Sequence, residues 1–100
     1  MITSFFPGRV RLRAPIFKEV DLVEKARSIL QKSDAIKNIE NNFLTGSVLI
    51  EYYPEKVPVK KLLPMQEFFA NLAKEAQHFD GKAESRKKIL SMLNELEEVF

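Results

Sequence analysis

The segment Arg9–Ala14 (RVRLRA) alternates charged and apolar side chains with a period of two. Because successive side chains of a strand point to opposite faces of a sheet, this pattern predicts a strand with one buried face. It sends three apolar side chains toward a core, whereas Arg9, Arg11 and Arg13 share the other face. Pro15 ends the strand. One face of the expected sheet is therefore lined with positive charge.

The period of the apolar residues changes several times after this strand. Apolar residues at helical spacing predict two amphipathic helices and a C-terminal one, with Pro64 expected at the first position of the second. A hairpin turn is expected at Gly46, because glycine adopts a positive φ readily. The expected elements are a strand, a helix, two strands and two helices, at about residues 9–14, 18–32, 36–43, 47–53, 62–76 and 82–100.

These elements predict a single α+β domain, residues 1–100, in which helices pack on an antiparallel sheet. The arrangement is the split β-α-β of the ferredoxin-like fold (β-α-β-β-α) with an additional amphipathic helix. The expected strand order is 36–43, 47–53, 9–14. A fourth strand would follow the second helix, but Gln77–Asp80 is too short and polar to form it. We therefore expect a missing fourth strand, a core of about residues 8–79, and an exposed edge at 9–14.

Composition excludes several classes of function. The chain has no cysteine, which rules out disulfides, thiolate nucleophiles and iron–sulfur clusters. It has three glycines, no phosphate-binding loop and no nucleophile–base pair, so we expect no enzymatic activity. It shows no membrane-spanning run and no signal peptide, which predicts a cytoplasmic protein without membrane insertion. A net charge of +2 does not by itself indicate nucleic acid binding.

Two segments of the chain resemble a known family. Gly8–Arg13 and Asn42–Pro54 are similar to the heavy-metal-associated (HMA-like) domain family, in its divergent branch without the cysteine motif. The resemblance extends over residues 8 to 72. It implies a ferredoxin-like fold, a role in metal homeostasis (iron is one candidate), and a protein partner such as a metal-transporting ATPase.

Ordinary members of that family hold a soft metal ion between two cysteines in the loop after the first strand. The matching loop, Ala14–Glu19, has no thiol, and soft ions such as Cu(I) select sulfur ligands. No metal site and no cofactor is therefore carried over. The resemblance predicts an accessory module that acts by protein contact or self-association.

The arginine row is the first candidate site. Side chains two residues apart on one face of a strand are about 6.6 Å apart. Arg9, Arg11 and Arg13 can therefore accept carboxylates, phosphates or an acidic helix. The alternative is a solvated face that favours solubility, helped by Glu51 on a neighbouring strand.

The last helix is the second candidate site. Its first half is basic and its end is acidic, an arrangement that opposes the helix macrodipole. This pattern favours an antiparallel pair of copies, which would bury the apolar stripe Ile89, Leu93, Leu96 and Phe100. One alternative is that the helix covers the open sheet face and its glutamates meet the arginine row. The other is that it docks on the preceding helix.

The remaining candidate residues do not indicate a metal, RNA or small-molecule site. His78 is the only histidine and is expected at a helix end, without a metal site. Glu95–Glu98 is expected to be a solvated face and not a cation site. RNA binding on the sheet needs stacking aromatics, for which only Tyr53 and Phe43 are candidates, so nucleic acid is not favoured. A small-molecule regulatory domain is a third alternative, although no residue singles out a ligand.

Overall fold

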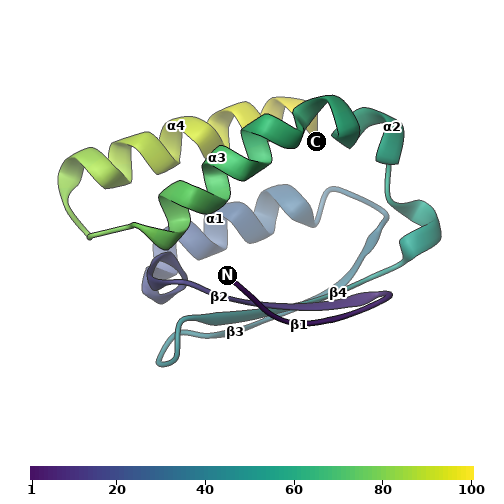
Figure 1. The fold of residues 1–100 in the computed structure, drawn as a ribbon, viewed down its shortest axis with the longest axis horizontal. Helices are drawn as coiled ribbons and strands as arrows, with labels where there is room; N and C mark the ends of the chain where they lie inside the picture. Colours follow the sequence, from purple (N-terminus) through teal and green to yellow (C-terminus); the bar gives the residue numbers. More distant parts are fainter.

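The structure, a computed structural model, describes the whole chain from Met1 to Phe100. A four-stranded antiparallel sheet forms one layer, and all the helices lie on one of its faces (Figure 1). The strands are β1 (Ile2–Phe6), β2 (Arg9–Arg13), β3 (Ile36–Asn42) and β4 (Ser47–Tyr52). The longer helices are α1 (Val20–Leu30), α3 (Gln66–Gln77) and α4 (Ala83–Val99). The short elements are η1 (Pro15–Lys18), η2 (Pro54–Lys56), α2 (Val59–Leu62) and η3 (Leu63–Met65).

The expectation of a missing fourth strand is wrong. The fourth strand is β1, which precedes the predicted elements and forms an antiparallel hairpin with β2. Phe6 pairs with Arg9, so the loop is Pro7-Gly8, in which Gly8 has a φ of 87°. Proline followed by a residue of positive φ is a common turn geometry, and glycine adopts that φ without steric penalty. The sheet order is β1-β2-β4-β3, so β2 is internal and the expectation that it forms an exposed edge is also wrong.

The three strands predicted from the sequence are present and occur in the predicted order. β4 pairs antiparallel with β2 on one side and with β3 on the other. β2 and β3 are therefore parallel to each other, with β4 between them and α1 connecting them. Gly46 has a φ of 69° in the turn that joins β3 to β4, as expected. The α+β class and the antiparallel sheet are confirmed.

The second helical region is divided near Pro64. A main helix beginning at this proline was expected, whereas the structure has α2, then η3 containing Pro64, and then α3 from Gln66. Proline has no backbone N–H to continue an α-helical hydrogen-bond ladder, which explains the interruption. α4 lies within the expected span. None of the helices is both long enough and apolar enough to cross a bilayer.

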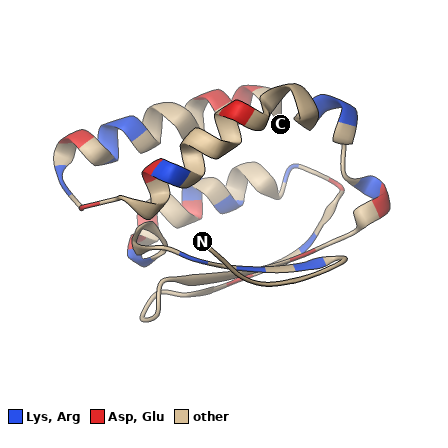
Figure 2. Ribbon diagram, in the orientation of Figure 1, with Lys and Arg blue, Asp and Glu red and all other residues tan.

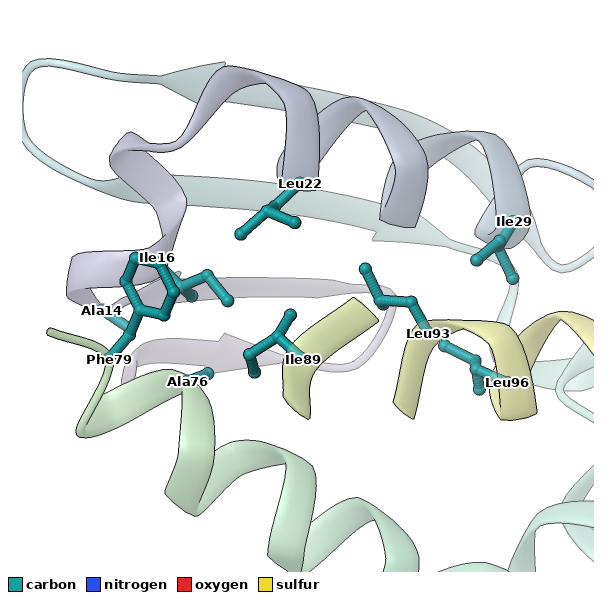
Figure 3. Packing of buried hydrophobic residues seen from close by; sticks show 9 residues of the cluster. All are labelled: Ala14, Ile16, Leu22, Ile29, Ala76, Phe79, Ile89, Leu93 and Leu96. Carbon is teal, nitrogen blue, oxygen red and sulfur yellow. The ribbon is translucent and has the colours of Figure 1, made fainter. Parts of the chain in front are cut away.

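The core is formed where the helices meet the end of β2. α4 packs against α1 and α3. Figure 3 shows Ile89 and Leu93 of α4 on the side that faces Leu22 of α1. Ile29 and Ile89 are the most deeply buried large side chains. The core cluster consists of Ala14, Ile16, Leu22, Ile29, Ala76, Phe79, Ile89, Leu93 and Leu96.

Candidate functional site

The arginine row lies on the face of the sheet that no helix covers. All three arginines are exposed, and the apolar residues between them are half-buried on the helix side. Figure 2 shows blue segments along β2, on the sheet layer and away from the helices. We call Arg9, Arg11 and Arg13 the arginine face. Their cross-strand neighbours on β4 are Glu51, Leu49 and Ser47.

No residue of the arginine face has a carboxylate partner within the chain. The ion pairs of the structure all lie on the helical side of the molecule. Glu51 is in register with Arg9, but its carboxylate accepts a hydrogen bond from Asn38 Nδ2 at 3.4 Å. Arg13 Nε donates to the carbonyl oxygen of Thr45 at 3.2 Å, and this neutral acceptor leaves the charge uncompensated. None of the three guanidinium groups is therefore held in an ion pair within the chain, although Glu40 and Glu51 lie on the same face of the sheet.

A polar hollow of about 610 Å³ opens on the same face. Arg11 and Arg13 line it together with Thr3, Ser47 and one carboxylate, Glu40. Guanidinium groups bind carboxylates and phosphates through paired N–H donors, and hydroxyl groups add further hydrogen bonds. The lining of the hollow therefore suits the binding of an anion.

The apolar residues expected to contact a partner lie in the chain's own core. Ile89, Leu93 and Leu96 are 1%, 4% and 4% exposed. Phe100 is half-buried and packs against the same cluster. Since α1, α3 and η1 already cover this stripe, a second copy cannot reach it in this fold. The stripe is core, and an interface on α4 would need its other face.

The charge pattern of α4 has partners within the chain. Arg86 forms ion pairs with Asp21 and with Glu19, the latter at 3.6 Å, at the start of α1. Lys88 Nζ lies 2.9 Å from Glu75 Oε1 of α3. The basic half of α4 is thus explained without a second copy. The glutamates of α4 lie on the helix side of the sheet, so they do not meet the arginine face as one alternative proposed.

The geometry offers no set of metal ligands. The loop after β2, where the resemblance places a metal, forms η1 and buries Ala14 and Ile16. His78 is the C-terminal cap residue of α3, and its Nδ1 lies 2.9 Å from the carbonyl oxygen of Lys74. It therefore lies at a helix end, as expected. No group of three or more histidine, cysteine, aspartate or glutamate side chains is placed to hold a metal ion.

An apolar cavity of about 390 Å³ lies between the sheet and the helices. Of its 21 lining residues, 19 are hydrophobic, and the two polar ones are Arg27 and Asn41. Asn41 is paired with Val48, a buried residue of β4, so its side chain faces the helices. Both polar atoms of its amide are buried and have no hydrogen-bond partner, which costs about 1–3 kcal/mol.

Sequence reasoning missed this cavity, although a signal for Asn41 was present. Ile39 and Asn41 are two residues apart on β3, and Ile39 is buried. The period of a strand therefore places Asn41 on the buried face. A polar residue at such a position indicates either a hydrogen-bond partner or a functional role.

β1 forms an apolar edge of the sheet. Ile2, Phe5 and Phe6 are 62%, 61% and 65% exposed, and β1 contains no charged residue. The opposite edge, β3, has Lys37 and Glu40 exposed on it, and charged residues protect an edge strand against pairing. β1 has no such protection.

Comparison with known proteins identifies one family. The family model described as heavy metal associated domain 2 matches residues 1–99. The matched range includes β1 and α4, beyond the segments that carry the resemblance in the sequence. No curated protein and no solved structure matches the chain.

Proposed function

The chain belongs to the heavy metal associated domain 2 family, and from this premise we propose that it is a non-enzymatic module of metal homeostasis that acts by binding another protein. The module has no cysteine, so it lacks the thiolate ligands that soft metals such as Cu(I) select. A metal ion, iron included, is handled by the partner. Partners of the class that the resemblance implies are metal-transporting ATPases.

The arginine face, which forms no ion pair within the chain, is the observation that carries this proposal. Arginines about 6.6 Å apart along a strand match glutamates at positions i and i+4 of a helix, whose Cβ atoms lie about 5–6 Å apart. An acidic helix of the partner can therefore lie along β2 and pair with successive arginines. Attraction between charged surfaces also speeds the encounter of the two proteins.

RNA is the competing ligand for this face. The structure adds one aromatic residue beside the arginines, since the exposed Phe6 pairs with Arg9. Tyr53 is less available for stacking, because the Lys56 ammonium lies 4.8 Å from the centre of its ring. Sequence-specific RNA binding on a sheet uses several stacking aromatics, so we favour the acidic protein and keep RNA as an outcome of the test.

Replacing Arg9, Arg11 and Arg13 together by glutamine is expected to weaken binding of an acidic helical peptide, with glutamates at i and i+4, by about tenfold to a hundredfold. The estimate is three exposed charge pairs at about 0.5–1 kcal/mol each. Titration calorimetry at two salt concentrations measures the effect. The difference between wild type and variant should shrink at high salt, because salt screens exposed charges.

The matched control replaces three exposed lysines of α2 and α4 by glutamine: Lys60, Lys61 and Lys87. It changes the net charge equally but leaves the arginine face intact, so binding should fall less than threefold. Equal losses in both variants would contradict a specific site. Tighter binding of single-stranded RNA than of the peptide would assign the face to nucleic acid. Turnover of a substrate, or tight Cu(I) binding, would end the proposal.

Self-association is the second contact in this proposal, and the exposed edge of β1 supports it. Two copies of β1 can pair antiparallel across a twofold axis, which is the symmetry of most homodimers. The backbone groups of both edges are then satisfied, and the exposed phenylalanines are brought together. The arginine face remains open on the same side of both copies.

Phe5→Lys is expected to abolish this dimer at concentrations where the wild-type chain forms it. Phe5 is 61% exposed, so the change should leave the monomer folded while placing a charge on the pairing edge. Light scattering over a concentration series measures the oligomeric state. Leu44→Lys is the control, because Leu44 is 91% exposed in the β3–β4 turn. A wild-type chain that is monomeric at all concentrations would contradict pairing through β1.

A further inference from the structure

We propose that the segment Pro54–Met65, here called the outer segment, docks the protein on the surface of an anionic lipid bilayer. Two exposed apolar side chains enter the head-group region, and three lysines pair with lipid phosphate and carboxylate groups. The segment rests on the bilayer and does not cross it. α2, at its centre, belongs to the helical layer (Figure 1), apart from the arginine face, so this proposal does not depend on the function proposed for that face.

The outer segment is rich in apolar residues but contributes none of them to the core. It comprises η2, α2 and η3, the elements between β4 and α3, and no residue of these three elements is buried. Five of its twelve residues are nonetheless valine, leucine or methionine. Exposed apolar residues that gather in one place mark a contact surface.

Val59 and Leu63 form the apolar part of this surface. Each is 53% exposed. The backbone stays in the right-handed helical region where α2 passes into η3, so side chains four residues apart lie on one face. The two side chains therefore point out of the molecule together.

The charged part of the surface consists of lysines. Lys56, Lys60 and Lys61 are all exposed, and none of them forms an ion pair within the chain. Glu55 is the one acidic residue of the segment, and the next along the chain is Glu67 in α3. Figure 2 shows the blue of these lysines at one end of the molecule. Lysines beside exposed apolar side chains suit a membrane interface, because their long stems let the ammonium groups stay among the head groups.

The residue types favour lipid over a protein partner. Protein interfaces are enriched in arginine, tyrosine and tryptophan and depleted of lysine. The outer segment has three lysines and no arginine, tyrosine or tryptophan. Clusters of lysine bind anionic head groups by electrostatic attraction that needs no fixed geometry. The outer segment and the arginine face are therefore expected to bind different partners.

The test is co-sedimentation of the full chain with lipid vesicles. Vesicles of phosphatidylcholine in which about one lipid in three is phosphatidylserine should bind the chain, and vesicles of phosphatidylcholine alone should not. Binding should weaken as salt is added, because salt screens exposed charges.

Lys60→Gln combined with Lys61→Gln is expected to weaken binding to the phosphatidylserine vesicles about twentyfold, at about fivefold for each charge. The matched control combines Lys82→Gln with Lys87→Gln. These lysines are exposed at the start of α4, at the opposite end of the molecule from α2 (Figure 1). The control changes the net charge equally, and its loss should stay below about threefold because its charges lie far from the bilayer.

Val59→Gln combined with Leu63→Gln removes the apolar contact and leaves the charge unchanged. It is expected to weaken binding about tenfold or more, because the wild-type side chains leave water when they enter the head-group region. The control combines Val20→Gln with Leu44→Gln, which replaces residues that are 55% and 91% exposed elsewhere. The control should bind like the wild type.

A single tryptophan reports entry into the bilayer directly, because the chain has none of its own. The emission of Leu63→Trp should shift to shorter wavelength on phosphatidylserine vesicles, since indole prefers the interface to water. The emission of Leu44→Trp should not shift. This measurement also separates entry of the side chain from attraction by charge alone.

Several results would overturn the proposal. One is a chain that does not sediment with phosphatidylserine vesicles at low salt. Another is a control pair that loses as much binding as its outer-segment counterpart, or an unshifted emission of Leu63→Trp. If replacing the arginine face by glutamine abolished vesicle binding and the change at Lys60 and Lys61 did not, the lipid contact would belong to that face. If Val59→Gln with Leu63→Gln abolished dimerisation, the outer segment would belong to a contact between copies.

Discussion

Ile89→Ala is expected to lower the free energy of unfolding by about 3–5 kcal/mol. Ile89 is only 1% exposed and lies in the core cluster between α4 and α1, so truncation leaves a void that the packed neighbours cannot fill. Domains of this size have a total stability of about 5–15 kcal/mol. The melting temperature should fall by about 12 °C or more, since 1 kcal/mol corresponds to about 4–8 °C. Thermal and urea unfolding measure the loss.

The control for this variant is Leu90→Ala on the same helix. Leu90 is 36% exposed and is not part of the core cluster, so its truncation should cost less than about 1 kcal/mol. The pair also separates a core role from an interface role. If Ile89 acted between two copies, its effect on stability would depend on protein concentration. A loss equal to that of Leu90→Ala would contradict the packing of α4 described above.

Gly46→Ala is expected to destabilise the chain by about 2–5 kcal/mol, for two reasons that add. The φ of 69° at Gly46 is unfavourable for any residue with a Cβ. A Cβ there would also lie 2.9 Å from the carbonyl oxygen of Ala14. The backbone cannot move aside easily, because Ala14 N donates to the Gly46 carbonyl oxygen at 3.0 Å. Unfolding in urea measures the effect.

Gly81→Ala is the control that isolates the contribution of the close contact with the Ala14 carbonyl oxygen. Gly81 has a φ of 79°, and a Cβ there meets no atom within 4 Å. The variant should therefore show only the conformational penalty, about 1 kcal/mol. Equal losses at Gly46 and Gly81 would mean that the close approach of the β3–β4 turn to Ala14 contributes nothing.

Local patterns predicted the elements whose period is strong. The alternation around Val10 and Leu12, and the strand at 47–53 that ends before Pro54, identified two neighbouring strands of the sheet. The order of the predicted strands in the sheet followed from the helix that connects β2 to β3, because such a connection leaves room for β4 between them. β1 was missed because Ile2–Phe6 (ITSFF) has no alternation of polar and apolar residues. Its only signal was the Pro7-Gly8 dipeptide before β2. This dipeptide is typical of a turn, and a turn there indicates a strand that precedes β2 in a hairpin.

The apolar stripe of α4 illustrates a limit of the same reasoning. Helical spacing shows that Ile89, Leu93 and Leu96 share one face and that this face is buried, but it does not say against what. A partner chain and the chain's own α1 satisfy the hydrophobic effect equally, since it is not directional. Tertiary contacts determine that the chain itself covers this face. They include the ion pair between Arg86 and Asp21, two residues that are remote in the sequence.

The sequence by itself determined that three arginines share one face of a strand, because the period of a β-strand is a local property of the backbone. It also determined the absence of thiol chemistry, because composition is independent of fold. Only the tertiary structure decided that no carboxylate forms an ion pair with the arginine face and that the amide of Asn41 is buried. Both depend on where segments distant in the chain come to lie, and no local period encodes those distances.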